Sequence, residues 1–411
     1  MQVEYAFSYK YQIRPTKSQI TKLENTFSMC RHLYNWYLKE KIEFYENEKI
    51  SISKYDQFKK LPQLKIERPH FKFVHSQVLQ NVIDRMHVAY KNFFRRVKEA
   101  KLPASEYGFP KFKKRGQWNS ITYPQFRSIP KNKLITIPKI GDIKMIYHRD
   151  LPDNCQIKTL TIVKEGQKWF VCFSLIVKKC ITELKQTFNN GKFVGIDLGI
   201  SEFWTTSSNE TCGETIEFFT KLKLLEKKKD KINKKLSKIP KRTKKYLKFL
   251  RILQNCHHKI KCFRNDFLHK QANKLLQMYD LIIFESLNIK KMVRRPKKKP
   301  NDDGSFAPNG AKEKSKLNKK IHTFSWGIFL EILKYKAKIF GKQIVEVNPF
   351  LTSQKCSNCG EIIRKTLSTR THMCSECGFV ANRDHNAAIN ILRLGIQSLG
   401  ISLEAPTIAQ A

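Results

Sequence analysis

Three carboxylates could do chemistry together, and two of them stand in apolar strands, where a charged side chain is costly. Asp197 interrupts the apolar run FVGIDLGI, Glu285 ends the apolar run LIIFE, and Asp384 begins the pattern DHNAAINIL. Each has an ordinary explanation, because Asp197 could be a turn residue, Glu285 a strand-end charge and Asp384 a helix cap. Together, two carboxylates from strands and one from a helix are the ligands that a two-metal phosphodiesterase site needs. Since oxygen ligands favour hard cations, we expect two catalytic Mg²⁺ ions, with Mn²⁺ as the alternative.

Four cysteines have the spacing of a metal site. CSNCG and CSECG form two CxxC pairs with 14 residues between them. Four thiolates complete a tetrahedral site and leave no open position for catalysis, so we expect one structural Zn²⁺ ion. A redox pair and unrelated thiols are the competing interpretations. The expected ligands are Cys356, Cys359, Cys374 and Cys377.

Strands and helices of the second half must position these groups. Runs of apolar residues predict strands, and apolar residues at helical spacing predict helices. The expected strands cover residues 193–200, 202–208, 280–287 and 343–349. The expected helices cover about 220–279 with a break near Pro240, about 325–340, and a last stretch after Asp384. Strands that alternate with helices are typical of an α/β or mixed sheet.

The first half combines strands with a helical segment. The first dozen residues alternate between apolar and polar types, and strand-like runs between Gly and Pro turns recur from about 102 to 179. Between them, apolar residues have helical spacing from Pro15 onward and again over 76–97. We therefore expect a small β domain with an inserted helical segment.

The composition excludes several classes of protein. The 411 residues are 41% hydrophobic, which is too apolar for a disordered chain, and no apolar run reaches the ~18 residues of a membrane span. No secretory signal is visible at the start, and the seven cysteines outside the CxxC pairs are scattered singly, as in a reducing compartment. The net charge of +44 favours nucleic acid as the partner, with a membrane surface as the weaker alternative.

Much of this positive charge is concentrated in two runs of basic residues. Residues 221–251 hold 15 Lys or Arg against Glu226 and Asp230, and their apolar residues keep helical spacing, which predicts a basic helical hairpin. Residues 290–320 hold 12 Lys or Arg against three acids, and we expect a loop that closes over the site when nucleic acid binds. The PKKKP sequence within the second run could instead be a nuclear address.

In their order along the chain, these motifs resemble a known family. The second half resembles the RuvC-like nuclease domain of TnpB, the ancestor of compact type V CRISPR effectors. The resemblance lies in the order of the strand Asp, the basic helices, the strand Glu, SWGIFLEILKYKAKIFGKQIVEVNP, TSQKCSNCG, CSECG and NRDHNAAINI. YQIRPTKSQITKLENTFSMCRHLYNWYL and YGFPKFKKRGQWNSITYP also look like TnpB. The resemblance spans most of the chain and is most specific after residue 191.

The resemblance implies a multidomain α+β fold. Its nuclease domain would be an RNase H-like (RuvC) mixed α/β domain with an inserted zinc knuckle, and its other part a wedge-like β-barrel with an inserted helical recognition domain. The implied divisions are 1–16 with 103–190 for the barrel, 17–102 for recognition, 191–350 with 378–400 for the nuclease including a basic lid loop at 290–320, 351–377 for the zinc-binding target-strand-loading module, and 401–411 for a disordered tail.

The resemblance also implies an activity and its partners. The protein would be an RNA-guided DNA endonuclease of a transposable element, which cleaves double-stranded DNA next to a short target-adjacent motif. Asp197, Glu285 and Asp384 would be the catalytic metal ligands; many relatives carry an acid where this chain has Asn382. A guide RNA from the transposon end and target DNA would be the partners of a monomeric ribonucleoprotein that binds no membrane. It would act in a prokaryotic cytoplasm, or in the nucleus of a eukaryotic host.

Two further sets of residues are candidate nucleic-acid contacts. Gln77, Gln80 and Asn81 lie on the polar face of a predicted helix, and their amides could read adenine in the major groove, although exposed polar residues need no such role. A basic segment interleaved with aromatic residues suits RNA phosphates and bases, or is an ordinary loop of the β domain. Its candidate contacts are Lys111, Lys113, Lys114, Arg115 and Trp118.

Other functions stay open at this point. A guide-RNA-dependent DNA-binding repressor would not need the three acids, whose presence disfavours it. A transposase that performs strand transfer could use a related acid triad. An actin-like ATPase would account for a strand followed by Asp-Leu-Gly, but it would explain neither the cysteine pairs nor the charge.

Overall fold

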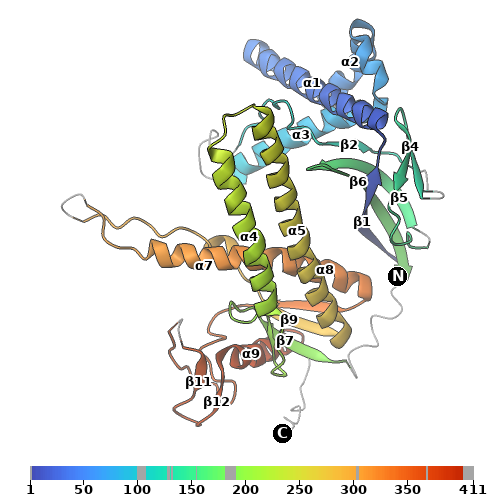
Figure 1. The fold of residues 1–411 in the computed structure, drawn as a ribbon. Helices are drawn as coiled ribbons and strands as arrows, with labels where there is room; N and C mark the ends of the chain where they lie inside the picture. Colours follow the sequence, from blue (N-terminus) through green and yellow to red (C-terminus); the bar gives the residue numbers. More distant parts are fainter. Residues whose placement is uncertain are drawn as a thin grey trace. The chain divides into compact units, whose positions relative to one another are not determined.

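The chain forms two compact units, residues 1–181 and 182–411, each with its own hydrophobic core. Figure 1 shows the computed structural model, which describes residues 2–99, 108–126, 130, 133–153, 155–180, 191–301, 305–366 and 369–400. The tail predicted over residues 401–411 lies outside the described residues.

The first unit is built on a six-stranded antiparallel sheet with the order β2-β5-β6-β1-β4-β3. The long strand β1 pairs with β6 along almost its whole length, from Gln2 opposite Cys180 to Ile13 opposite Trp169. The first strand of the chain is thus a central strand of this sheet. The strands are β1 (Gln2–Arg14), β2 (Ser120–Tyr123), β3 (Leu134–Ile137), β4 (Gly141–Met145), β5 (Cys155–Glu165) and β6 (Lys168–Cys180).

A helical segment is inserted between β1 and β2, as the sequence predicted. The first helix is capped by Thr16, whose hydroxyl accepts from the backbone N–H of Gln19 at 3.3 Å in a capping box. The third helix buries an apolar stripe that includes Leu79, Ile83 and Met86. The helices are α1 (Lys17–Glu48), α2 (Lys54–Glu67), the 3-10 turn η1 (Pro69–Phe73) and α3 (Ser76–Glu99).

The second unit has a four-stranded sheet with the order β10-β9-β7-β8 at its centre. β7 (Phe193–Asp197), β9 (Leu281–Glu285) and β10 (Gln343–Val347) are parallel, and β8 (Thr205–Thr206) is antiparallel to β7. β8 is shorter than the predicted strand over 202–208, because a turn with Asn209 at φ 62° folds the chain back on Thr206.

Helices cover both faces of this sheet, and its central strands β7 and β9 are accordingly apolar on both sides. Ile282 and Phe284 of β9 belong to the larger core with α5 and α8, whereas Leu281 and Ile283 belong to a smaller core with Ile391 of α9. The helices are α4 (Thr215–Ser237), α5 (Lys244–Met278), α6 (Ile289–Met292), α7 (Ala311–Phe324), α8 (Trp326–Phe340) and α9 (Arg383–Ser398), and a two-stranded sheet joins β11 (Thr371–Met373) to β12 (Val380–Asn382).

Two predictions about the basic runs have different outcomes. The helical hairpin with a break near Pro240 is confirmed, since α4 ends at Ser237 and α5 begins after the cap Thr243. The loop predicted over 290–320 was wrong at residues 290–292, which belong to α6, and from residue 311 onward, where α7 begins. Leu317 and Ile321, four residues apart, pack against the core and stabilise that helix. Among the described helices, none is long and apolar enough to cross a membrane.

Candidate active site and nucleic-acid surfaces

Asp197 and Glu285 are the last residues of the adjacent parallel strands β7 and β9. Ile196 pairs with Phe284, so the two acids stand at the same level of the sheet. Because side chains alternate along a strand, Asp197 shares a face with Gly195, and Glu285 shares a face with Ile283. That is the face on which α9 lies. The two carboxylates therefore leave the same edge of the sheet toward the same helix.

Helix α9 brings the third carboxylate to this edge. It lies directly on the strands, because a Cβ atom added to Gly195 would be 2.1 Å from the carbonyl oxygen of Ala388. Its N-cap is Asn382, whose Oδ1 accepts from the backbone N–H of Asp384 at 2.8 Å. Asn382, rather than Asp384, therefore caps the helix. The Asp384 carboxylate lies over the turn after β7, where its Oδ2 would be 3.5 Å from a Cβ on Gly199.

The electrostatics of the three acids indicate mutual repulsion. Burial raises the pKa of Asp197 well above its usual range, and the charges of Glu285 and Asp384 raise it further, against a smaller opposing effect of Arg383. Burial also raises the pKa of Glu285, which the hydroxyl of Thr352 counteracts by donating to Oε1 at 2.5 Å. A divalent cation relieves such repulsion, so this set of oxygen ligands fits Mg²⁺ or Mn²⁺.

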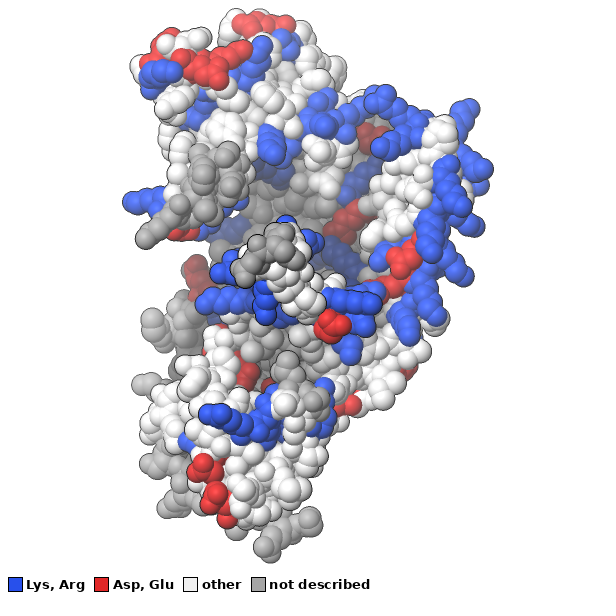
Figure 2. All heavy atoms as spheres, turned by 90° about the vertical axis from the view of Figure 1, so that its left-hand side faces the viewer, with Lys and Arg blue, Asp and Glu red and all other residues white. Residues whose placement is uncertain are grey.

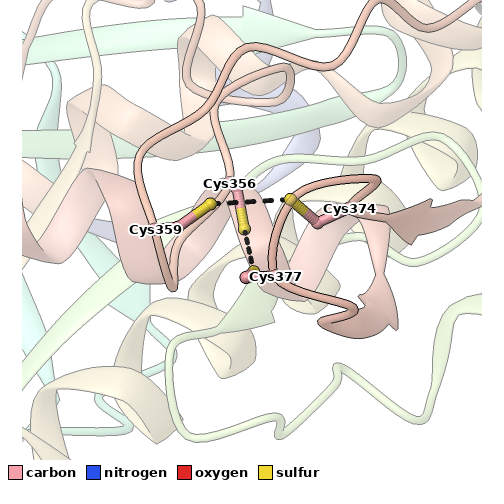
Figure 3. Close-up of side chains that lie close together, drawn as sticks. All are labelled: Cys356, Cys359, Cys374 and Cys377. Atoms are coloured by element: carbon pink, nitrogen blue, oxygen red, sulfur yellow. Dashed lines mark hydrogen bonds between the residues drawn. The ribbon is translucent and has the colours of Figure 1, made fainter.

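The four predicted cysteines converge on one point, as Figure 3 shows. Their sulfur atoms all lie within 4.8 Å of one another, and among the described residues the three carboxylates form no group as compact. The Sγ atoms of Cys356 and Cys377 are 3.7 Å apart, and those of Cys359 and Cys374 are 3.5 Å apart. Four sulfurs in this arrangement could hold a metal ion and fit a closed zinc site.

Several residues that hold the acid site were not found from the sequence. Thr352 bonds Glu285, and Asn386 and Asn390 of α9 bond the backbone just before and within the first CxxC turn. Gly195 and Gly395 allow α9 to approach the strands. The spacing of the two asparagines, four residues apart on a helix, is the signal that could have indicated a shared polar contact.

The predicted amide residues of α3 lie on one side of the helix. Gln80 is exposed, while Gln77 and Asn81 are half-buried. The Nε2 of Gln77 donates to Oε1 of Gln125 at 3.1 Å, so this amide already has a partner within the unit.

The basic segment after residue 108 is fixed to helix α1. The amide of Asn35 bonds both backbone groups of Lys113, accepting from its N–H at 2.8 Å and donating to its carbonyl at 3.0 Å. Trp118 packs inside the unit, with its ring 5.5 Å from that of Tyr34 and the guanidinium of Arg85 5.6 Å from its centre. The side chains of Lys111, Lys114 and Arg115 are exposed.

A surface hollow of about 590 Å³ lies beside this segment. Arg95 and Arg96 of α3 line it, although no motif singled them out. Its other polar and aromatic lining includes Tyr34, Asn92, Phe109 and Lys111.

The α4–α5 hairpin carries the largest concentration of basic residues. Figure 2 shows Lys and Arg side chains along this hairpin, on the right of the view. The basic side chains between 221 and 251 are exposed, with Lys229 half-buried, whereas Leu222 and Ile232 are buried in the core. The hairpin is thus a packed element with one strongly positive surface.

Comparisons with family models match three stretches of the chain. Residues 5–49 match a helix-turn-helix domain and residues 174–295 a model described as "Probable transposase", both of the OrfB group of IS605 elements. Residues 326–391 match a Cas12f1-like TNB domain. In the structure, the first stretch consists of β1 and the single long helix α1.

Relatives and a solved structure extend these matches to most of the chain. InsQ of Escherichia coli K12 is 28% identical over 393 residues, which cover 94% of this chain and 92% of InsQ. A protein of Streptomyces pristinaespiralis is 27% identical, over 96% of this chain and 90% of its own length. In the solved Cas12f1–sgRNA–target DNA complex, the protein is 17% identical, with a TM-score of 0.56 over 91% of this chain and 82% of that one, and so has a similar fold. The resemblance to TnpB that the motifs indicated is confirmed by these matches, which together extend over most of the chain.

Proposed function

We propose that this protein is an RNA-guided DNA endonuclease that hydrolyses phosphodiester bonds at Asp197, Glu285 and Asp384. InsQ and the Streptomyces relative are both named for a proposed RNA-guided DNA endonuclease activity. The observation that carries the proposal is the position of the acids, two at the ends of adjacent parallel strands and the third on the helix packed against them. An RNase H-like nuclease needs this arrangement of acids.

The three carboxylates would hold a pair of Mg²⁺ or Mn²⁺ ions. Such ions, when bound, activate the attacking water and stabilise the leaving oxygen. The residues of this chain supply the binding and the orientation. Thr352 fixes one oxygen of Glu285, and Arg383 adds a positive charge beside Asp197 while its guanidinium donates to the carbonyl of Thr366 at 3.0 Å. Because burial, with the added repulsion of Glu285 and Asp384, keeps the pKa of Asp197 high, this carboxylate gains most from a bound cation.

The other parts of the chain receive roles in this proposal. Residues 191–350 with 378–400 form the nuclease domain, and 351–377 a module held by one Zn²⁺ ion. Residues 1–16 with 103–190 form a wedge-like barrel, and 17–102 recognise DNA, with Gln77, Gln80 and Asn81 as contacts. The region 290–320, which ends in part of α7, closes over the three acids when guide and target bind.

Guide RNA and target DNA would bind mainly through charge. The net charge of +44 and the exposed basic α4–α5 hairpin suit an RNA–DNA hybrid whose phosphate backbone the protein contacts. Base pairing within the hybrid then supplies the sequence specificity. Lys111, Lys113, Lys114 and Arg115 would contact RNA phosphates beside the hollow near Phe109.

The proposal is tested on the purified ribonucleoprotein. RNA that copurifies with the protein is sequenced, and the complex is then given Mg²⁺ and a plasmid library with randomised sequence beside the target. We expect one discrete RNA and cut plasmids that share a short flanking motif. Asp197→Asn should lower the cleavage rate roughly 10²- to 10³-fold without changing RNA binding, because it removes a charge that the transition state needs.

Asp230→Asn is the matched control, since Asp230 is an exposed acid on α4 and should leave cleavage unchanged. Absence of a discrete RNA, or full activity of Asp197→Asn, would contradict the proposal. Bound but uncut DNA would indicate a repressor, and joined DNA products would indicate a transposase.

A further inference from the structure

The acid site and the cysteine cluster are connected by a strip of buried polar residues. Thr352, Ser357, Asn386 and Asn390 are 4%, 3%, 0% and 6% exposed. Thr352 and Ser357 belong to the segment that enters the first CxxC turn, whereas the asparagines lie on α9, shortly after Asp384. Buried polar groups in this number persist only when they are hydrogen-bonded, so their partners show what the strip holds together.

One side of the strip is the face of α9. Nδ2 of Asn390 donates to the carbonyls of Thr352 at 2.9 Å and Lys355 at 2.7 Å. The amide of Asn386 donates to the carbonyl of Lys355 at 2.8 Å and accepts from the N–H of Ser357 at 2.9 Å. One turn further on, the guanidinium of Arg393 donates to the carbonyl of Ser357. Residues 386, 390 and 393 share one helix face, so this face holds segment 352–357 against α9.

The other side of the strip is the acid site. The hydroxyl of Thr352 donates to Oε1 of Glu285 at 2.5 Å, and the hydroxyl oxygen of Thr352 also lies 3.3 Å from the carbonyl oxygen of Pro349, a longer contact. A hydroxyl has a single hydrogen to donate, and the charged carboxylate is the stronger acceptor. Thr352 therefore restricts the rotation of the Glu285 carboxylate and leaves Oε2 for another ligand. Its own backbone is fixed by Asn390.

We propose that Thr352 is a positioning residue for Glu285, and that Asn386 and Asn390 set its place by fixing the first cysteine turn to α9. The inference rests on the proposed function, in which Glu285 binds a catalytic cation. Groups that hydrogen-bond a metal-ligating carboxylate orient it, and their loss commonly weakens metal binding. In this chain the orienting group comes from the cysteine module, the segment 351–377 that carries the four cysteines. The module therefore helps to order the acids in addition to any contact with nucleic acid.

The test measures Mn²⁺ binding by electron paramagnetic resonance on the full-length ribonucleoprotein. The Mn²⁺ that is lost in Asp197→Asn defines the acid site. Thr352→Val removes the hydroxyl and keeps the branched shape, and should raise the Mn²⁺ concentration for half-saturation roughly 10-fold or more. Thr352→Ser, which keeps the hydroxyl, should bind Mn²⁺ like the original protein. Half-saturation unchanged in Thr352→Val would overturn the inference.

A second variant tests the asparagine contacts. Asn390→Ala should weaken Mn²⁺ binding and increase hydrogen exchange at residues 352–357, while the zinc content stays at that of the original protein. If this variant does not fold, Thr352→Val and Thr352→Ser decide the inference. A protein that shows the expected Mn²⁺ changes but never cuts DNA contradicts the proposed function alone. If the Thr352→Val variant cuts DNA with the same Mg²⁺ requirement as the original protein, that result contradicts this inference alone.

Discussion

His87 of α3 is a neutral histidine held at the contact with α2. Its Nε2 lies 2.9 Å from Oε1 of the buried Gln57. Burial, helped by the charges of Lys41 and Lys54, lowers the pKa of His87 to about 4, against an opposing effect of Asp84. Because the unfolded chain has the ordinary histidine pKa of about 6.5, it binds more protons than the folded chain between these two values.

The first unit should therefore lose stability as the pH falls from about 6.5 toward 4. We expect hydrogen exchange of the α2 and α3 amides to rise over this window in the original protein. His87→Gln keeps a side-chain N–H for Gln57 and cannot be protonated, so its exchange should rise less. Equal increases in both proteins would contradict this account of His87.

Individual residues differ in how far the sequence reveals their role. Asp197 and Glu285 stand out because a charge inside an apolar run needs a reason. Thr352 and Asn390 do not stand out, since threonine and asparagine are common in turns and caps. Their role depends on hydrogen bonds between residues 67 and 38 positions apart, which exist only in the folded chain.

At the level of elements, the position of α9 on the sheet depends on Gly195 and Gly395, which permit close packing, rather than on the charged residues at its N-terminus. A Cβ at Gly195 would meet the backbone of α9 at 2.1 and 2.5 Å, which neither element can absorb without moving. Gly195→Ala should thus displace α9, lower stability by about 1–3 kcal/mol and slow cleavage about 10²-fold. Thermal unfolding and cleavage assays measure the two effects.

The matched control for this change is Gly327→Ala. Gly327 lies in α8, where alanine favours the helix and the nearest atom is the terminal methyl group of Ile289 at 3.3 Å. Its cleavage rate should stay unchanged. A Gly195→Ala protein with normal cleavage would mean that α9 can shift without moving Asp384.

The basic hairpin gives a prediction about salt. Lys227, Lys234 and Lys241 are exposed on α4 and the turn that follows it. Their replacement by Gln should weaken guide RNA binding and reduce the slope of log affinity against log salt by up to about two to three. Filter binding at several salt concentrations measures this slope. Arg at the same positions should preserve it, and an unchanged slope in the Gln variant would exclude this surface from RNA binding.

Elements were predictable where one pattern dominated. The hairpin was found because apolar spacing persisted through the charge and Pro240 marked its break. Helix α7 was missed because its apolar core contacts, Leu317, Ile321 and Phe324, are few among the lysines and stabilise the helix only by packing against the core. The length of strand β8 was overestimated. Phe203 and Trp204 are residue types common in strands, but here they are buried in the core before the pairing with β7 begins at Thr205.

For the whole molecule, the two separate cores predict a local response to metal removal. The cysteine module contacts α9 and Glu285 but belongs entirely to the second unit. A chelator that removes Zn²⁺ should increase hydrogen exchange at residues 352–357 and 383–398, because the metal supplies folding free energy there. Exchange in β5 and β6 of the first unit should not change. An equal increase in both units would contradict this separation.

The sequence predicts the class of the whole molecule better than its arrangement. Charge, cysteine spacing and acid order predict a metal-dependent nucleic-acid enzyme, and the relatives bear out the likeness to RNA-guided DNA endonucleases. The sheet order β2-β5-β6-β1-β4-β3 could not be predicted, because strands far apart in sequence become neighbours only through long-range pairing.

The pairing of β1 with β6 also matters during synthesis of the protein. β1 leaves the ribosome well before β6, since Ile13 pairs with Trp169, more than 150 residues later. At roughly 5–20 residues per second, β1 waits about 8–30 s for its partner. During that delay its unpaired edges are open to other nascent chains, while α1 to α3 can already fold. Slow translation between residues 14 and 168 should therefore increase aggregation of newly made protein.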